Sequence, residues 1–321
     1  MLIASPSGAS AIIRKEFPGK CTHYGLRRKH NFGVWASEFP AFLPKEVENI
    51  KDQFARNLAS RIDRLPVPLS LTKNHIMSSC VKPKTLSKTS PLVLLHGFDS
   101  SLLEWRYVLP LLEEAGLETW AFDVLGWGFS DLENLPPCNV ASKRDHLYQF
   151  WNSYIRRPMT LVGPSLGAAV AIDFVVNYPQ AVHVDKLIFI DASVYAEGTG
   201  NLAKLPKLMA YAGVYLLKSI PLRLYATSLT FNRISWNNCV DWTNVKQKAL
   251  VIWGENDQII DSKLSVRLQC ELPNAIIQQV PDCGHIPHVE KPAAVSKLIT
   301  DFVQVDGQVD IPASLACLKK V

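Results

Sequence analysis

Short runs of consecutive apolar residues recur through the middle and the last third of the chain, each bounded by glycine, proline or polar residues. Such runs are typical of strands that are buried on both faces of a parallel sheet. Segments between them carry apolar residues at spacings of three and four, which predict helices. The expected strands are the run that ends at Gly163 and residues 91–95, 119–122, 186–191, 248–254 and 275–280.

The expected helices lie between these strands. Strands that alternate with helices over about residues 90 to 305 predict an α/β fold with a doubly wound, mostly parallel sheet. In such a sheet, ligands bind beyond the C-terminal ends of the strands, where the glycine-containing breaks of this chain fall. The helical segments are residues 101–117, a segment that carries Leu147 and Phe150, the segment from the glycine-rich break to Tyr178, and residues 262–272 and 292–303.

The segments outside this alternation have their own patterns. Residues 44–62 have one apolar face and predict a helix docked on the main domain, and residues 67–90 leave room for two antiparallel edge strands. Residues 194–246 mix leucines with lysines and aromatic residues, and we interpret them as a short helical cap over the site. The expected organisation is a targeting peptide (1–37), an N-terminal helix and linker (38–66), the first part of the core (67–193), the cap (194–246), the second part of the core (247–305) and a polar tail (306–321).

The first 37 residues are basic, with a single acid, Glu16, and several serines and threonines. This composition predicts a transit peptide, and we expect a chloroplast location; a mitochondrial location, or a disordered basic tail of a cytoplasmic protein, is the alternative. A secretory signal would need a continuous apolar core, which this segment lacks. The basic residues are Arg14, Lys15, Lys20, Arg27, Arg28 and Lys29.

Composition narrows the class of protein. The 321 residues are 48% hydrophobic, enough for one large core, and no run of about 18 apolar residues predicts a spanning helix. A net charge of +5 without a long basic block gives no indication of nucleic-acid binding. The seven cysteines are scattered without a C-x-x-C pair, so we interpret them as reduced thiols rather than as a disulfide framework or a metal site.

An apolar run ends in Gly163-Pro164-Ser165-Leu166-Gly167 and continues into a segment of small residues. This pattern is typical of a strand, a sharp turn and a helix with an exposed serine at the apex. Gly163 and Gly167 leave the space that such a turn requires. Ser165 is therefore the candidate nucleophile.

A serine hydroxyl needs a base to take its proton, and an imidazole, with an unperturbed pKa of about 6.5, suits this role. A carboxylate must then orient the ring. His285 and Asp257 each follow a late strand, and they complete the order Ser, Asp, His. Asp191 is an alternative acid, and His288 is an alternative base.

These motifs, with His96-Gly97-Phe98 and the run from Asp123 to Ser130, make residues 90–305 similar to the α/β-hydrolases that have a serine nucleophile and a cap. The N-terminal extension and the Cys-Gly-His-Ile-Pro-His run resemble the plant plastid branch of that family. The resemblance implies an oxyanion hole formed by the backbone N–H groups of Phe98 and Leu166. It implies neither a cofactor nor a metal.

The expected activity is hydrolysis of an ester, a thioester or a related acyl bond in a small or lipid-like apolar substrate, through an acyl-enzyme. A C–C bond hydrolase with the same three residues and a non-catalytic small-ligand receptor of the same fold are the alternatives. The expected partner is the substrate, with no nucleic acid and with peripheral membrane contact through the cap. The oligomeric state and the natural substrate stay open. The shortness of residues 194–246 leaves it open whether the cap is complete enough for activity.

Overall fold

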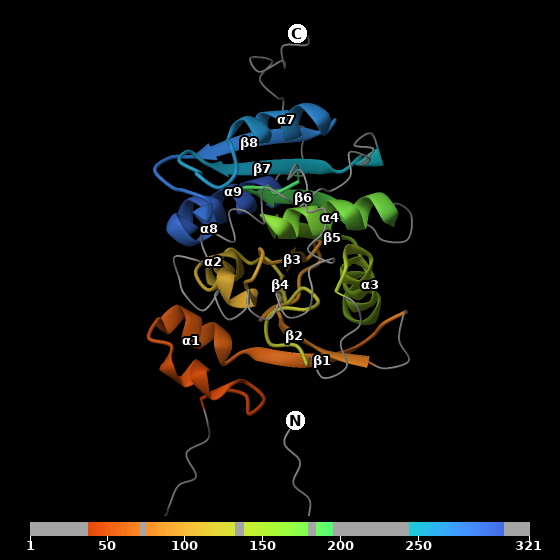
Figure 1. Cartoon of the computed structure of the whole chain (residues 1–321), viewed down its shortest axis with the longest axis vertical. Coiled ribbons are helices and arrows are strands. Elements are labelled where there is room, and N and C mark those ends of the chain that lie inside the picture. Colours follow the sequence, from red (N-terminus) through yellow and green to blue (C-terminus); the bar gives the residue numbers. More distant parts are fainter. Residues whose placement is uncertain (1–37, 71–74, 132–137, 179–183, 195–243, 305–321) are drawn as a thin grey trace, which may run out of the picture. The chain divides into compact units, whose positions relative to one another are not determined.

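The computed structural model describes residues 38–70, 75–131, 138–178, 184–194 and 244–304 (Figure 1). In this part of the chain, eight strands form a single sheet. They are β1 (Ile62–Pro68), β2 (His75–Val81), β3 (Leu92–Leu94), β4 (Thr119–Phe122), β5 (Met159–Pro164), β6 (Val184–Ile190), β7 (Lys248–Gly254) and β8 (Ala275–Val280).

Helices connect these strands and cover the sheet. None of the helices in the described segments is long and apolar enough to span a membrane. They are η1 (Lys45–Asn49), α1 (Gln53–Ala59), η2 (Leu102–Trp105), α2 (Val108–Glu114), α3 (Val140–Phe150), η3 (Trp151–Ile155), α4 (Leu166–Asn177), α7 (Lys263–Glu271), α8 (Pro287–Glu290) and α9 (Pro292–Gln304).

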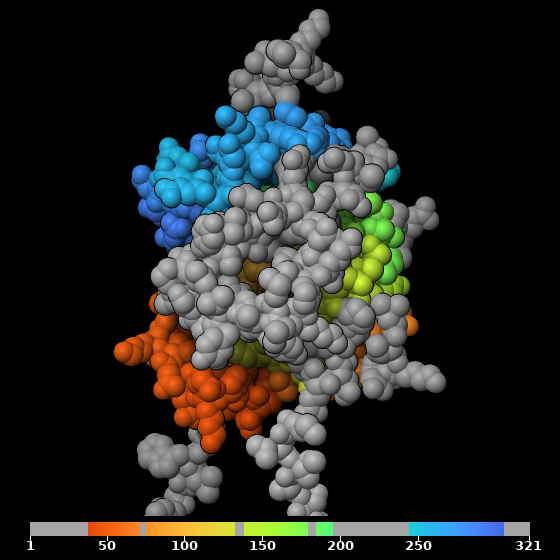
Figure 2. All heavy atoms as spheres, in the orientation of Figure 1, coloured from red at the N-terminus to blue at the C-terminus, as the bar shows by residue number. Residues whose placement is uncertain are grey.

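The strand order is β1-β2-β4-β3-β5-β6-β7-β8. β1 and β2 pair antiparallel, as do β2 and β4, and every later pairing is parallel. In Figure 2 the atoms of the first elements of the described chain (orange) gather at one end and those of the last elements (blue) at the other, in agreement with this strand order. The predicted mostly parallel α/β fold is confirmed.

Alternate residues of each strand enter two separate cores. Val93 packs on one face of the sheet, whereas Leu92 and Leu94 pack on the other. Helices α3, α4 and α7 contribute to the first core, and α1, α2 and α9 contribute to the second. Because both faces are covered, the central strands are apolar along their whole length, which is the pattern visible in the sequence.

The chain reverses its direction of travel across the sheet at β3. From β3 it passes through α2 to β4 on one side, and then through α3 to β5 on the other side. A parallel sheet opens a crevice at the C-terminal strand ends where the order reverses in this way. The segments that follow β3 and β5 therefore start at this crevice.

Two predicted helices are each divided. The helix expected over 44–62 is wrong as a single element, because Ile50 is extended and Asp52 starts a new helix by accepting hydrogen bonds from the N–H groups of Phe54 and Ala55. The segment 101–117 likewise forms η2 and then α2. Cys80, Cys138 and Cys283 are reduced thiols, but Cys270 is disulfide-bonded, so the expectation of reduced thiols is wrong there.

Three of the expected segments lie wholly or mostly outside the described residues. The transit peptide over 1–37 and the polar tail over 306–321 lie outside the described residues. The same holds for the cap over 194–246, apart from Val194 and residues 244–246 at its two ends.

Asp123, directly after β4, joins three segments beside the crevice. Its fully buried carboxylate accepts hydrogen bonds from the N–H groups of Leu102 (2.6 Å) and Phe129 (2.9 Å) and from the hydroxyl of Ser79. A Cβ on Gly128 would lie 2.0 Å from the carboxyl carbon of Asp123, so only glycine fits there. One carboxylate thus ties β2, η2 and the loop after β4 together.

Replacing Asp123 by alanine leaves three buried donors without an acceptor. We expect Asp123→Ala to lower the free energy of unfolding by about 3 kcal/mol, measured by urea denaturation. The matched control is Asp301→Ala, which removes only an exposed ion pair with Lys297 in α9 and changes the same quantity by less than about 0.5 kcal/mol. Equal effects of the two substitutions would contradict the role given to Asp123.

Candidate active site

Ser165 occupies the sharp turn between β5 and α4. Its backbone has φ 47° and ψ −114°, a conformation that L residues rarely adopt. A Cβ on Gly163 would lie 2.3 Å from the carbonyl carbon of Gly167, and a Cβ on Gly167 would lie 2.9 Å from the carbonyl oxygen of His96. The two glycines let the strand, the helix and the loop after β3 touch through their backbones, and this contact holds the serine in its strained conformation.

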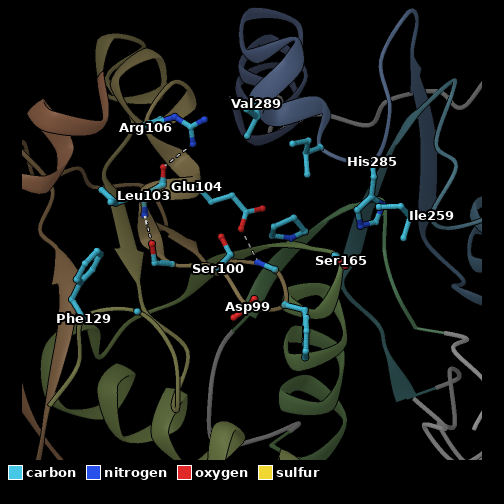
Figure 3. Close-up of a pocket in the computed structure, with 16 residues that line it drawn as sticks. Asp99, Ser100, Leu103, Glu104, Arg106, Phe129, Ser165, Ile259, His285 and Val289 are labelled. Carbon is cyan, nitrogen blue, oxygen red and sulfur yellow. Dashed lines mark hydrogen bonds between the residues drawn. The ribbon is translucent and has the colours of Figure 1, made fainter. Parts of the chain in front are cut away.

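The side chain of Ser165 lies at the floor of a pocket. The residue is 6% exposed, and its Oγ makes no hydrogen bond to any described residue, His285 included. Ser165 and His285 both line a cavity of about 650 Å³ (Figure 3). Hydrogen bonds between catalytic groups are often long or poorly aligned until a substrate binds.

Asp257 and His285 form a hydrogen-bonded pair beside this cavity. Oδ2 of Asp257 accepts a hydrogen bond from Nδ1 of His285 at 2.8 Å, and its Oδ1 accepts from the N–H groups of Ile259 and Ile260. Burial would raise the pKa of Asp257, but these three donors hold it below its ordinary value. An ionised Asp257 fixes the proton of the neutral imidazole on Nδ1, which makes Nε2 the hydrogen-bond acceptor.

The loops that carry this pair are joined through their backbones. Asn256 donates its N–H to the carbonyl oxygen of Cys283 at 2.9 Å. A Cβ on Gly254 would lie 2.0 Å from the carbonyl oxygen of Gly284. The segments after β7 and β8 are therefore in direct contact, and the spacing of Asp257 and His285 follows from it.

The loop after β3 is fixed by His96. The N–H of Val124 donates to Nε2 of His96 at 3.0 Å, so this nitrogen carries no proton. Nδ1 then holds the proton and donates to the carbonyl oxygen of Gly97 at 2.8 Å. His96 is thus a neutral ring that shapes the loop ahead of Phe98.

A second carboxylate–imidazole pair also holds this loop. Glu104 accepts a hydrogen bond from the N–H of Gly97 (2.9 Å) and another from Nε2 of His288 (2.6 Å). Burial would raise the pKa of Glu104, but the contact with His288 lowers it to about 2. His288, the alternative base, is fully buried against Trp105 and is engaged by Glu104.

Sequence reasoning did not identify Glu104. Its partners Gly97 and His288 are 7 and 184 residues away along the chain, so no local pattern marks it. Asp191, the alternative acid, lies at the end of β6, where its Oδ1 accepts a hydrogen bond from the N–H of Gly254 at 3.0 Å.

Among the described residues, the set with the spacing of metal ligands is Asp191, Asp257 and His285. One ligand atom from each lies within 4.8 Å of the others. The Nδ1 atom of His285 is already bonded to Asp257, so a metal ion would have to displace that contact.

The pocket has a mixed lining. Ile259 lies beside His285, Phe129 lies on the opposite side of the pocket from Ile259, and the polar side chains of Ser100 and Arg106 also line it (Figure 3). Arg106 is paired with Asp52 at 2.9 Å, so its charge is compensated. The cavity therefore offers both apolar and polar contacts.

Comparisons with known proteins agree with this architecture. The family model described as "Alpha/beta hydrolase family" matches residues 92–298. The chain is 54% identical over 299 residues to "Alpha/beta hydrolase domain-containing protein VTE7" of Arabidopsis thaliana, across 82% of this chain and 90% of that protein. It is 23% identical to human "Monoacylglycerol lipase ABHD6", across 66% of this chain and 74% of that protein.

A solved structure has the same fold. A thermophilic esterase from Thermogutta terrifontis superposes with a TM-score of 0.56 at 19% identity, across 75% of this chain and 97% of that one. The family match, the plant relative and the eight-stranded sheet together show that the chain belongs to the α/β-hydrolase family.

Proposed function

We propose that this protein is a serine hydrolase that cleaves an ester, a thioester or a related acyl bond, with Ser165 as nucleophile, His285 as base and Asp257 as the residue that orients the base. The observation that carries the proposal is the position of the strained Ser165 in the same cavity as the imidazole that Asp257 holds. This arrangement has the parts that acyl transfer requires.

In the proposed reaction, Oγ of Ser165 attacks the carbonyl carbon while Nε2 of His285 takes the hydroxyl proton. His285 then gives that proton to the departing alcohol or thiol, and an acyl-enzyme remains. Water attacks the acyl carbon, loses its proton to His285, and releases the acid as the proton returns to Ser165. Asp257 stays ionised throughout and stabilises the imidazolium.

The backbone N–H groups of Phe98 and Leu166 are the proposed oxyanion donors. Phe98 lines the cavity after β3, and Leu166 begins α4 directly behind Ser165. A helix N-terminus presents N–H groups toward negative charge. Each such donor contributes on the order of 3 kcal/mol in the transition state.

The proposed substrate has an apolar acyl or alcohol part and a polar end. The apolar residues of the pocket lining favour an apolar part, and its polar side chains favour a polar end. The similarity to a monoacylglycerol lipase is consistent with a lipid-like ester.

We propose a chloroplast location on the basic, acid-poor composition of residues 1–37 and on the similarity to a plant protein. These residues, fused to a fluorescent protein in plant cells, are expected to direct it into chloroplasts. Fluorescence that stays in the cytosol, or that enters mitochondria, would contradict the location.

A fluorophosphonate probe tests the nucleophile, because it reacts only with an activated serine. Labelling of Ser165→Ala is expected to be abolished, and His285→Ala is expected to react roughly a thousandfold more slowly. The measurement is the rate of probe incorporation on a gel, with circular dichroism to verify folding. Ser60→Ala, which alters an exposed serine after α1, is the matched control and is expected to label at the wild-type rate.

Equal labelling of wild type and Ser165→Ala would remove the proposed function. The same probe separates an enzyme from a non-catalytic receptor of this fold, since a receptor needs no activated serine. A C–C bond hydrolase would label in the same way, so turnover of short p-nitrophenyl esters, dependent on Ser165, is the accompanying readout.

The Glu104–His288 pair is expected to support the oxyanion loop. His288→Ala leaves a buried carboxylate without its partner, so we expect a loss of about 3 kcal/mol in the free energy of unfolding. We also expect roughly tenfold slower probe labelling. Glu104 accepts a hydrogen bond from the N–H of Gly97, and without His288 its side chain is no longer held in place for that bond. The exposed His75 supplies the control His75→Ala, with changes below about 0.5 kcal/mol.

The pH dependence of stability gives a second readout for this pair. Because the pKa of Glu104 is lowered from 4.5 to about 2, its contribution is present above pH 4.5 and is lost as the pH falls toward 2. His288→Ala is expected to remove this contribution, measured as unfolding midpoints across that window. The role of the pair would be contradicted if His288→Ala labelled at the wild-type rate and its unfolding midpoint fell with decreasing pH in the same way as that of the wild type.

A further inference from the structure

Asp191 lies beside the proposed catalytic pair without a role in it. The residue is fully buried and follows β6 directly, with φ 43°. Its N–H donates to the carbonyl oxygen of Ile252, and its Oδ1 accepts from the N–H of Gly254, both at 3.0 Å. Its Oδ2 atom is buried and, with the carboxyl group ionised, has no hydrogen-bond partner among the described residues. A buried carboxylate oxygen in this state needs either a donor or a proton.

The carboxyl group of Asp257 lies close to that of Asp191. One ligand atom each of Asp191, Asp257 and His285 lies within 4.8 Å of the others. Two carboxylates this close in a buried site are not both ionised, because their charges repel without solvent to screen them. A proton on one of them turns the repulsion into a hydrogen bond.

The surroundings decide which carboxyl group keeps the proton. Asp257 receives three hydrogen bonds, from His285, Ile259 and Ile260, which hold its pKa below the ordinary value. Asp191 receives one, from Gly254. Burial first, and then the negative charge of Asp257, raise the pKa of Asp191 to about 9.

The other titratable groups that act on Asp191 do not oppose this assignment. Glu290 in α8 adds negative charge and so also favours a protonated Asp191. Cys283 has a pKa raised to about 11, chiefly by burial, so it is a neutral thiol. His285 is already committed to Asp257 through Nδ1.

We propose that Asp191 and Asp257 hold one proton between them at neutral pH, with Asp191 as the hydrogen-bond donor, so that Asp191 is a positioning residue that fixes Asp257 behind His285. The inference rests on the proposed function, because Asp191 acts by holding Asp257, the acid of the proposed triad, in position. Asp191 connects the ends of three strands: it directly follows β6, accepts a hydrogen bond from Gly254 at the end of β7 and, through Asp257, reaches the loop after β8.

An asparagine at position 191 reproduces the protonated acid. Its Oδ1 can accept from Gly254, and its Nδ2 can donate to Asp257, with no proton to lose. If Asp191 were ionised, it would only accept hydrogen bonds, and asparagine would not reproduce it. Asp191→Asn and Asp191→Ala therefore have different expected effects.

Rates of fluorophosphonate labelling at pH 7.5 test the hydrogen bond. Asp191→Ala is expected to slow labelling at least tenfold, and Asp191→Asn to slow it less than threefold. In an Asp257→Ala background, Asp191→Ala should add less than a twofold effect, because a positioning residue acts through its partner. The proposal would be overturned if Asp191→Asn and Asp191→Ala lowered the labelling rate equally. It would also be overturned if the effects of Asp191→Ala and Asp257→Ala on that rate were fully additive.

Thermal unfolding between pH 5 and pH 8 tests the proton itself. The folded protein holds a proton on Asp191 that the unfolded chain, with an aspartate pKa near 3.8, releases, so wild-type stability falls as pH rises toward 9. Asp191→Asn does not titrate, so its melting temperature relative to wild type should rise by roughly 5 °C from pH 5 to pH 8. A difference that stays constant with pH would overturn the proposal even if Asp191→Asn reacts well.

The two proposals fail separately. If labelling does not depend on Ser165, the proposed function is wrong, whatever Asp191 does. If labelling depends on Ser165 and His285 but Asp191→Asn behaves like Asp191→Ala, only the shared proton is wrong.

Discussion

The site depends on a contact between backbones at the turn around Ser165. Gly163 and Gly167 have no side chains, so the end of β5, the start of α4 and the carbonyl of His96 meet at distances that no Cβ would allow. This contact compensates the strain of a serine at φ 47°. A turn relaxed by a larger residue would rotate Oγ away from the cavity, and no arrangement of acid and base could compensate for that loss.

Two carboxylate–imidazole pairs support the segments around this turn and have different roles. Asp257 and His285 come from adjacent loops after β7 and β8, and they provide the proposed proton transfer. Glu104 and His288 hold the backbone of Gly97, which leads into the proposed oxyanion hole. The same kind of pair therefore has a proposed catalytic role in one case and a structural role in the other. The hydrogen-bond partners of each pair determine which role it has.

The sequence predicts the sheet well and the polar network poorly. The strands 119–122, 248–254 and 275–280 match the structure because each is a continuous apolar run between clear breaks. The helix expected over 44–62 divides because one capping side chain, Asp52, outweighs the apolar periodicity. The pairing of His288 with Glu104 depends on how α8 meets η2 in space, which no spacing along the chain encodes.

A crystal structure of the fluorophosphonate-treated protein is the most direct measurement of the central claim, that Ser165 reacts in a site built by β3, β5, β7 and β8. The account predicts phosphorus bonded to Oγ of Ser165, the phosphonyl oxygen within hydrogen-bond distance of the N–H groups of Phe98 and Leu166, and the imidazole of His285 beside the adduct. An adduct on another residue, or a phosphonyl oxygen pointing away from both N–H groups, would contradict it.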